Sequence, residues 1–305
     1  MREAALRPPA KPRRSLAARF DAEARAAYAL LLPVIVLFVL FQYYPIVKSF
    51  AVSFFEYGLL RRETPFVGVA HYARQFADPL FLSALVNTLV FVAGTVAVGI
   101  VLALGCAVLV EGTGRWAHFY RTLYFVPVVT SLMATAMVWR WLYASDGLIN
   151  FLLALVGIGP QPWLLSESLA LPSLMALTIW KNLGFDLILF SAAIQGIPQD
   201  LYEAAHLDGA SPWARFWYVT LPSLRPIVLI VCVTAVIRSF QVFTIILAMT
   251  QGGPINATRT LVYHLYEQGI QYDEVGYASA AAVVLLVLIG GMTYAQMRLG
   301  RRMAG

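Results

Sequence analysis

Several polar side chains stand inside long apolar runs, and they are the first residues to consider for chemistry. Lys181 and Asp186 belong to one run, and Arg238 and Gln241 belong to the next. Charged groups at membrane depth are costly, so they usually face a polar path or a partner on a neighbouring helix. Lys181 and Asp186 are five residues apart and do not share a helical face as i, i+4 pairs do. The alternative is an interhelical salt bridge or a snorkelling side chain, and we favour it for Arg140.

The sequence offers no catalytic or metal-binding pattern. It has no His-Glu-x-x-His, no Gly-x-Ser-x-Gly and no phosphate loop of the Gly-x-x-x-x-Gly-Lys-Ser/Thr type. The two cysteines lie inside apolar runs without metal-ligand spacing. We therefore expect the chain not to be an enzyme, with no catalytic residue, no cofactor-binding residue and no metal site of its own.

Composition indicates a membrane protein. Of the 305 residues, 60% are hydrophobic and 12% are charged, and the mean hydropathy is +0.73. Soluble domains contain about 45–50% apolar and about 25% charged residues. The net charge of +6 comes from basic residues in short loops and tails. Membrane orientation explains such placement better than binding to nucleic acid, which we do not expect.

Six apolar runs are long enough to span a bilayer, which takes roughly 20 helical residues. Separate spans must be helices because lipid leaves no partner for open backbone groups. The sequence therefore predicts an all-α, polytopic membrane protein with six transmembrane helices, at about 26–48, 83–110, 120–143, 169–193, 226–249 and 276–297.

The basic residues predict the orientation of these spans. They concentrate in the N-terminal tail, in the loops after the second and fourth spans and at the C-terminus. Because cytoplasmic segments are enriched in Lys and Arg, both termini and the loop at about 195–225 are expected in the cytoplasm. Residues 1–25 read as a disordered basic cytoplasmic tail, and residues 26–305 as a single membrane domain.

The loop at about 195–225 has the capping signals of two short helices. Asp200 is the expected N-cap of the first helix, and Gly209 is a suitable left-handed stop after it. Ser211 followed by Pro212 restarts a helix, since serine caps well and proline is tolerated at the first position. An apolar stripe follows on one face, formed by Trp213, Phe216, Trp217 and Thr220. The pattern predicts two short helices joined by a sharp bend.

The same loop resembles a known family. The spacing of the Glu-Ala-Ala loop in permeases of ATP-binding-cassette (ABC) importers is similar to that of Glu203-Ala204-Ala205, then Gly209 after three intervening residues, then Val219 and Leu221-Pro222. One position departs, since Val219 stands where the family pattern has Ile. The resemblance implies coupling helices that dock on a cytoplasmic ATPase. The residues expected to couple to the ATPase are Glu203, Ala204, Ala205, Asp208, Gly209, Leu221 and Pro222.

The resemblance extends over nearly all of the chain after the tail. Tyr44-Pro45, Phe66-Val67-Gly68, Thr250-Gln251-Gly252-Gly253-Pro254 and the stretch 276–280 look like the binding-protein-dependent carbohydrate permeases of the maltose and glycerol 3-phosphate type. This resemblance implies a sugar as substrate, with glycerol 3-phosphate or a related phosphodiester as the alternative. Aromatic rings suit the apolar faces of sugars, and amides and charges suit their hydroxyls. The residues expected to line the substrate path are Trp180, Lys181, Asn182, Arg238, Gln241 and Phe243.

The resemblance also implies an assembly in the bacterial inner membrane. It would contain a second permease subunit, two copies of a cytoplasmic ATPase that binds ATP and Mg²⁺, and an extracytoplasmic substrate-binding protein. A secondary transporter or channel is a more distant alternative, and it would normally show more spans or internal inverted repeats.

Overall fold

The computed structural model describes residues 16–304, and no β-strand occurs among them. The chain forms two compact units, Met1–Ala51 and Val52–Gly305, and each is described by itself. The expected disordered tail ended at residue 25, whereas helix α1 already begins at Leu16. The rest of that tail, residues 1–15, lies outside the described residues.

The first unit is one long apolar helix with a local change of register. It comprises α1 (Leu16–Phe38), the π-helical turn η1 (Val39–Tyr43) and most of α2 (Tyr44–Val52). The π-turn is closed by the amide of Tyr44, which donates to the carbonyl of Val39. Pro45 follows directly and has no backbone N–H, so it cannot donate the α-helical hydrogen bond expected at its position. The wider π-helical turn η1 lies next to this missing bond.

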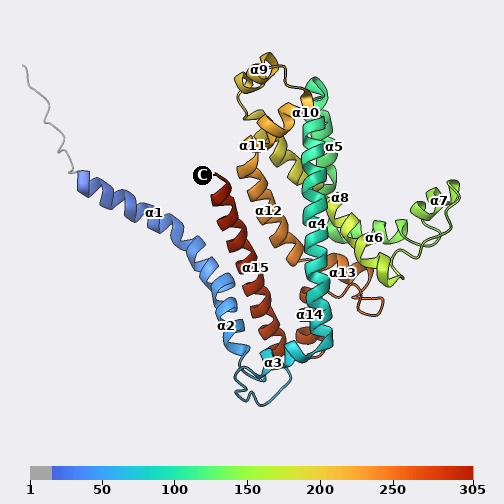
Figure 1. Cartoon of the computed structure of the whole chain (residues 1–305). Coiled ribbons are helices and arrows are strands. Elements are labelled where there is room, and N and C mark those ends of the chain that lie inside the picture. Colours follow the sequence, from blue (N-terminus) through green and yellow to red (C-terminus); the bar gives the residue numbers. More distant parts are fainter. Residues whose placement is uncertain (1–15, 305) are drawn as a thin grey trace, which may run out of the picture. The chain divides into compact units, whose positions relative to one another are not determined.

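The second unit holds the remaining helices (Figure 1). In chain order they are α3 (Ala70–Ala77), α4 (Pro79–Glu111), η2 (Gly114–Trp116), α5 (Ala117–Val129), α6 (Leu132–Leu142), α7 (Leu148–Leu155), α8 (Glu167–Gln195), α9 (Gln199–Leu207), α10 (Pro212–Arg215), η3 (Phe216–Thr220), α11 (Leu221–Ser223), α12 (Arg225–Phe240), α13 (Thr244–Met249), α14 (Leu261–Tyr266), η4 (Glu267–Gln271) and α15 (Val275–Ala304).

The long helices have the length and hydropathy of membrane spans. Four are uninterrupted: Ala27–Val52, Pro79–Glu111, Glu167–Gln195 and Val275–Gly300. Two more are bent pairs, Gly114–Val129 with Leu132–Leu142 at 96° and Pro212–Ser223 with Arg225–Phe240 at 68°. Counting each pair once gives six among the described residues, in agreement with the predicted all-α polytopic fold.

Helices α8 and α12 organise the packing of the second unit. Helix α8 lies against α4 and α5, and α12 lies against α4 and α15 (Figure 1). Fully buried side chains at these contacts include Leu187 and Phe190 of α8 and Phe240 of α12. The helices α9 to α11 gather at one end, which we call the loop end, while α3 and α14 lie toward the opposite, far end (Figure 1).

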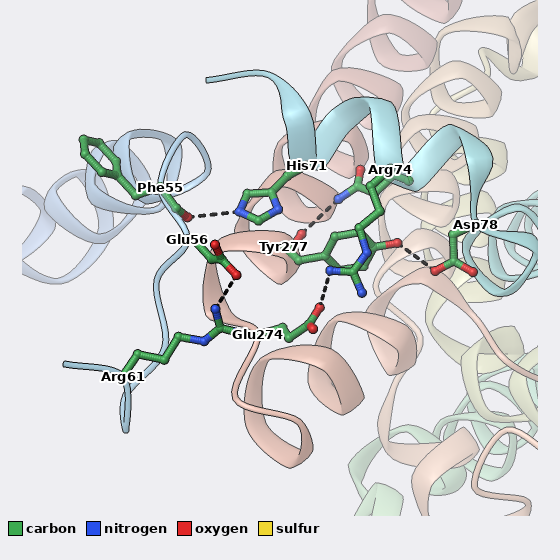
Figure 2. A network of polar contacts seen from close by, with 9 residues as sticks. Phe55, Glu56, Arg61, His71, Arg74, Asp78, Glu274 and Tyr277 are labelled. Carbon is green, nitrogen blue, oxygen red and sulfur yellow. Dashed lines mark hydrogen bonds and ion pairs between the residues drawn. The ribbon is translucent and has the colours of Figure 1, made fainter. Parts of the chain in front are cut away.

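A polar network ties the far end together (Figure 2). Arg74 on α3 forms an ion pair with Glu274 at 2.7 Å, and its guanidinium lies 4.5 Å from the ring centre of Tyr277. The Tyr277 hydroxyl donates to Asp78 at 2.8 Å, and His71 is 3.0 Å from the carbonyl oxygen of Phe55. These contacts fix the segment after the first unit and α3 against the start of α15.

Two predicted spans are not continuous helices. The expected third span, 120–143, breaks between α5 and α6, where Thr130 and Ser131 are extended. The expected fifth span, 226–249, breaks between α12 and α13 around Gln241 to Phe243. Carbonyl groups left open at both breaks accept side-chain donors from elsewhere in the chain. The hydropathy of these runs is continuous, so it gave no sign of either break.

Candidate functional site

The loop end carries a sharply turned helical hairpin built by local signals. Gly209 has φ +77° and follows α9, as predicted. The amide of Ala210 donates to the carbonyl of Ala205 at 2.9 Å, and that of Gly209 donates to the carbonyl of His206 at 3.0 Å. This pair of bonds is a Schellman motif, which ends a helix and reverses the chain. The predicted left-handed stop is therefore confirmed.

The second helix of the hairpin also begins where the sequence predicted. The Ser211 hydroxyl accepts from the amide of Ala214 at 3.2 Å, and Pro212 occupies the first position. The first helix begins differently, because its N-cap is Pro198 and not Asp200, which lies in the first turn. The extended backbone of Pro198, with ψ 133°, sets this earlier start.

The residues expected to contact an ATPase lie on the surface of this hairpin. Glu203, Ala204, Asp208 and Gly209 are exposed, and Ala205 is half-buried. The Tyr202 hydroxyl lies 2.9 Å from that of Thr220, which links α9 to η3. The hairpin thus presents an acidic, small-residue surface on a fixed backbone.

Leu221 and Pro222 lie at the turn between the hairpin and α12. Both are half-buried where the chain turns toward α12. The amide of Leu221 closes the π-turn η3 by donating to the carbonyl of Phe216. As with Pro45, the proline that follows cannot donate, so the wider turn precedes it. The predicted apolar stripe is largely on the surface, since the exposed fractions of Trp213 and Trp217 are 70% and 46%.

A central cavity of 470 Å³ lies where the two broken spans meet α4 and α8. It brings together five of the six residues expected to line a substrate path, namely Lys181, Asn182, Arg238, Gln241 and Phe243. The sixth, Trp180, is not among its lining residues, and its ring instead packs on Trp139 with centroids 5.4 Å apart. The breaks themselves make the cavity, because the chain around Thr130 and from Gln241 to Thr244 forms part of its wall.

Lys181 closes the break in the third span. Its ammonium group donates to the carbonyl oxygens of Pro127, Val128 at 3.1 Å and Thr130 at 2.8 Å. These carbonyls lie at the C-terminal end of α5, where a helix leaves carbonyls open, and that of Pro127 also accepts from the amide of Thr130 at 3.3 Å. A cation at a helix C-terminus is also favoured by the helix dipole. The three N–H donors of Lys181 are thus directed to the backbone.

Arg238 is paired within the same cavity. Its Nη2 lies 2.6 Å from Oδ1 of Asp186, and its guanidinium lies 5.1 Å from the centre of the Phe185 ring. Asp186 has a buried side chain with 6% exposure, whereas that of Arg238 is 32% exposed. Asp186 and Arg238 thus form a salt bridge between α8 and α12 and also line the central cavity.

The remaining polar wall of the cavity is uncharged. Asn182 donates to the carbonyl of Thr178 at 2.9 Å, and the Thr95 hydroxyl donates to that of Ser239 at 2.9 Å. Gln241 is exposed at the end of α12. Sequence reasoning missed Thr95, Thr130 and Ser239, because hydroxyl residues in an apolar helix usually bond their own backbone. The cavity therefore offers amides, hydroxyls and the ring of Phe243.

One strongly buried titratable group, His264, lies outside the predicted spans. Burial and the nearby Arg259 guanidinium lower the pKa of His264 to about 4, so the ring is neutral near pH 7. The Tyr143 hydroxyl, at the end of the expected third span, donates to the carbonyl of Ser173 at 3.0 Å. Within residues 16–304 no cluster of three or more His, Cys, Asp or Glu side chains has metal-binding geometry.

Taken together, the bent spans, the polar central cavity and the turned hairpin at one end are typical of a membrane permease. Residues 99–305 match the family model described as "Binding-protein-dependent transport system inner membrane component". The chain belongs to this family and is the permease of an ABC importer. The family comprises transport permeases, so the expectation that the chain is not an enzyme is confirmed and the alternative of a secondary transporter or channel is dropped.

Curated relatives match over nearly their full lengths. The arabinooligosaccharides transport system permease protein AraP of Bacillus subtilis is 32% identical over 274 residues, which is 88% of this chain and 87% of that protein. The lactose transport system permease protein LacF of Rhizobium radiobacter is 31% identical over 271 residues, covering 87% and 90%. A probable ABC transporter permease of Bacillus subtilis, YurN, is 33% identical over 89% of this chain and 94% of its own.

Solved structures agree with these relatives. A chain of a bacterial ABC transporter that imports the acidic polysaccharide alginate aligns with a TM-score of 0.82 at 25% identity, covering 93% of this chain and 98% of that one. A chain of the bacterial alginate transporter in complex with its pentasaccharide-bound periplasmic protein aligns with a TM-score of 0.83 at 23% identity, covering 93% and 96%. The second likeness shows the fold alone.

Proposed function

We propose that this permease forms one half of a path for a neutral sugar across the inner membrane. The observation that carries this proposal is that both cations of the central cavity are already bonded within the chain. Lys181 directs its donors to backbone carbonyls, and Arg238 is bound to Asp186. The groups left to meet a substrate are amides, hydroxyls and an aromatic ring, which match the hydroxyls and apolar faces of a sugar.

The permeases AraP and LacF, named for arabinooligosaccharides and lactose, support a saccharide as the substrate. The alternative substrate is glycerol 3-phosphate or a related phosphodiester. It draws on the exposed part of Arg238, since a phosphate is a strong acceptor for guanidinium. Such a ligand would compete with Asp186 for the same group, so a neutral substrate is the better fit.

The hairpin at the loop end is proposed to receive the motion of an ATPase. Glu203, Asp208 and the small Ala204 and Ala205 would meet a groove on that partner, while Gly209 fixes the bend between them. Leu221 and Pro222 would transmit the displacement to α12 through the turn that they close. ATP and Mg²⁺ would be bound by the ATPase, and this chain would hold neither.

The proposed assembly contains a second permease subunit, two copies of the ATPase and an extracytoplasmic binding protein. The distribution of Lys and Arg favours the cytoplasm for the loop end and for both termini. The far end, with its polar network and the Gly-Gly-Pro turn, would then face outside and meet the binding protein.

Sugar uptake by the reconstituted assembly tests the proposed path. Gln241→Ala removes an exposed amide of the central cavity, and we expect a several-fold rise in KM because one or two hydrogen bonds to the sugar are lost. Gln271→Ala is the matched control, since Gln271 is exposed in η4 and lines no cavity described above. Equal KM values for the two variants would contradict the assignment of the path.

A further inference from the structure

A second and larger cavity lies outside the proposed path. It has a volume of 600 Å³ and opens between the end of α6, the segment before α8 and the turn after α13. None of the residues expected on the substrate path lines it. Helix α8 runs from this cavity to the loop end, so the cavity belongs to the far half of the second unit.

The frame of this cavity is fixed by one buried amide. Asn150 is 3% exposed and donates to the carbonyl oxygens of Ala144 at 3.0 Å and Gln161 at 3.1 Å. Its Oδ1 accepts from the amide of Gln161 at 2.9 Å and from the indole N–H of Trp163 at 3.0 Å. Both donors and the oxygen of this side chain are used, so three chain segments are held in one arrangement.

Opposite this frame, the Gly-Gly-Pro turn is also tied down. The Thr258 hydroxyl lies 2.7 Å from that of Thr250 and 2.7 Å from the carbonyl of Gly253. The amide of Gln251 donates to the carbonyl of Ile246 at 2.8 Å. A concave site with fixed walls can bind a ligand without a large ordering cost.

The walls combine aromatic rings with polar side chains. The rings of Tyr143 and Trp163 lie 5.8 Å apart, and the polar group of each is bonded to the protein frame. Arg140 and Gln251 are exposed at the rim, and Arg140 alone carries a charge among the described residues that line the cavity. Aromatic walls with a few convergent donors are the usual chemistry for the apolar faces and hydroxyls of a saccharide.

An aromatic chain connects this cavity to the neighbourhood of the central one. From Trp163 it passes to Tyr143, then to Trp139 at 5.4 Å, and then to Trp180 at 5.4 Å. Trp180 directly precedes Lys181 and Asn182, which line the central cavity. Trp180, which does not line the central cavity, is therefore the last ring of this aromatic chain.

We propose that the cavity bounded by Arg140, Tyr143, Trp163 and Gln251 is a second saccharide-binding site, separate from the central cavity. A sugar ring would pack on Trp163, which the buried ring of Tyr143 supports, and Arg140 and Gln251 would bond the hydroxyls. The proposal rests on the proposed function for the presence of a sugar at this face, but its residues differ from those of the path.

The test uses the whole importer complex in lipid nanodiscs without its binding protein. Saturation-transfer NMR with lactose and with arabinotriose as probes would measure direct contact with the protein. The background carries Gln241→Ala and Phe243→Ala, which weaken the central cavity. In this background we expect saturable transfer to both sugars from aromatic protons, and about tenfold weaker binding when Arg140→Gln and Gln251→Ala are added.

Both added changes are at exposed positions, so the fold should survive, which gel filtration and thermal unfolding would check. Arg115→Gln is the matched control, because Arg115 is exposed beyond α4 and lines neither cavity. The proposal is overturned if neither sugar gives saturable transfer in this background, or if the Arg140 and Gln251 changes leave binding as the control does. Failure of the proposed path would show separately, as an unchanged KM for uptake in Gln241→Ala.

Discussion

The bend at Gly209 gives the sharpest prediction about coupling. Its φ of +77° lies in the left-handed region, and a Cβ added there would meet no atom within 4 Å. Gly209→Ala therefore carries a conformational cost without a clash, about 1–2 kcal/mol. That cost changes the ratio of correctly bent to other hairpins by a factor of about 5–30. Gly209→Asn should cost less, since Asn tolerates this conformation.

Gly209→Pro is more severe for two reasons. Proline fixes φ near −65°, and it removes the amide that donates to the carbonyl of His206 at 3.0 Å. The assay is sugar uptake per ATP hydrolysed by the reconstituted complex. We expect coupling to fall in the order wild type, Asn, Ala, Pro, with the membrane helices intact by circular dichroism.

Gly114 supplies the matched control for this series. It also has a positive φ, +58°, and open space around an added Cβ, but it lies in the turn between α4 and α5. Gly114→Ala should therefore carry a similar strain and leave coupling unchanged. The reasoning is refuted if Gly209→Pro couples as the wild type does, or if Gly114→Ala uncouples as strongly as Gly209→Ala.

Three further predictions concern stability, each measured as thermal unfolding of the purified protein in detergent. Lys181→Met removes the donor to the carbonyls of Val128 and Thr130 and should destabilise by about 2 kcal/mol, whereas Lys48→Met at an exposed position should not. Equal midpoints would argue against the capping role. Gly184→Ala should lower the free energy of unfolding by about 1–3 kcal/mol, because the added Cβ would collide with the backbone of α5. Gly290→Ala has open space around the added Cβ and should be neutral. A Gly184 variant as stable as the wild type would contradict the close crossing of α5 and α8. In the folded protein the pKa of His264 is about 4, below the ordinary 6.5, so its contribution to the free energy of unfolding is fully present above about pH 6.5. This contribution falls by at most about 3 kcal/mol toward pH 4. His264→Phe should remove the pH dependence, and an unchanged pH dependence would assign it to another group.

Features fixed by neighbouring residues were predictable from the sequence. Gly209 and Ser211-Pro212 mark the hairpin because capping depends on the few residues around each helix end. The number of spans was predictable too, because the hydropathy of each span depends only on the residues within it. The exception is Asp200, where a favourable N-cap residue lost to the extended backbone of Pro198 two positions earlier.

Features fixed by distant residues were not predictable in this way. The break after α5 depends on Lys181, more than fifty positions later in the chain, as the separations of 53 and 51 residues to Val128 and Thr130 show. The break after α12 is supported by Thr260, whose hydroxyl lies 3.3 Å from the carbonyl of Val242. Lys181, Asp186 and Arg238 were all noticed in the sequence, but which groups they bond to was not predicted.

The central claim is that this permease carries a neutral sugar under the control of a separate ATPase. The most direct measurement is ATP hydrolysis by the complex purified from its host and reconstituted with its binding protein, titrated with a panel of saccharides and with glycerol 3-phosphate. We expect stimulation by a neutral sugar and none by the phosphate, because both cations of the central cavity are already bonded within the chain. Stimulation by glycerol 3-phosphate alone would contradict it.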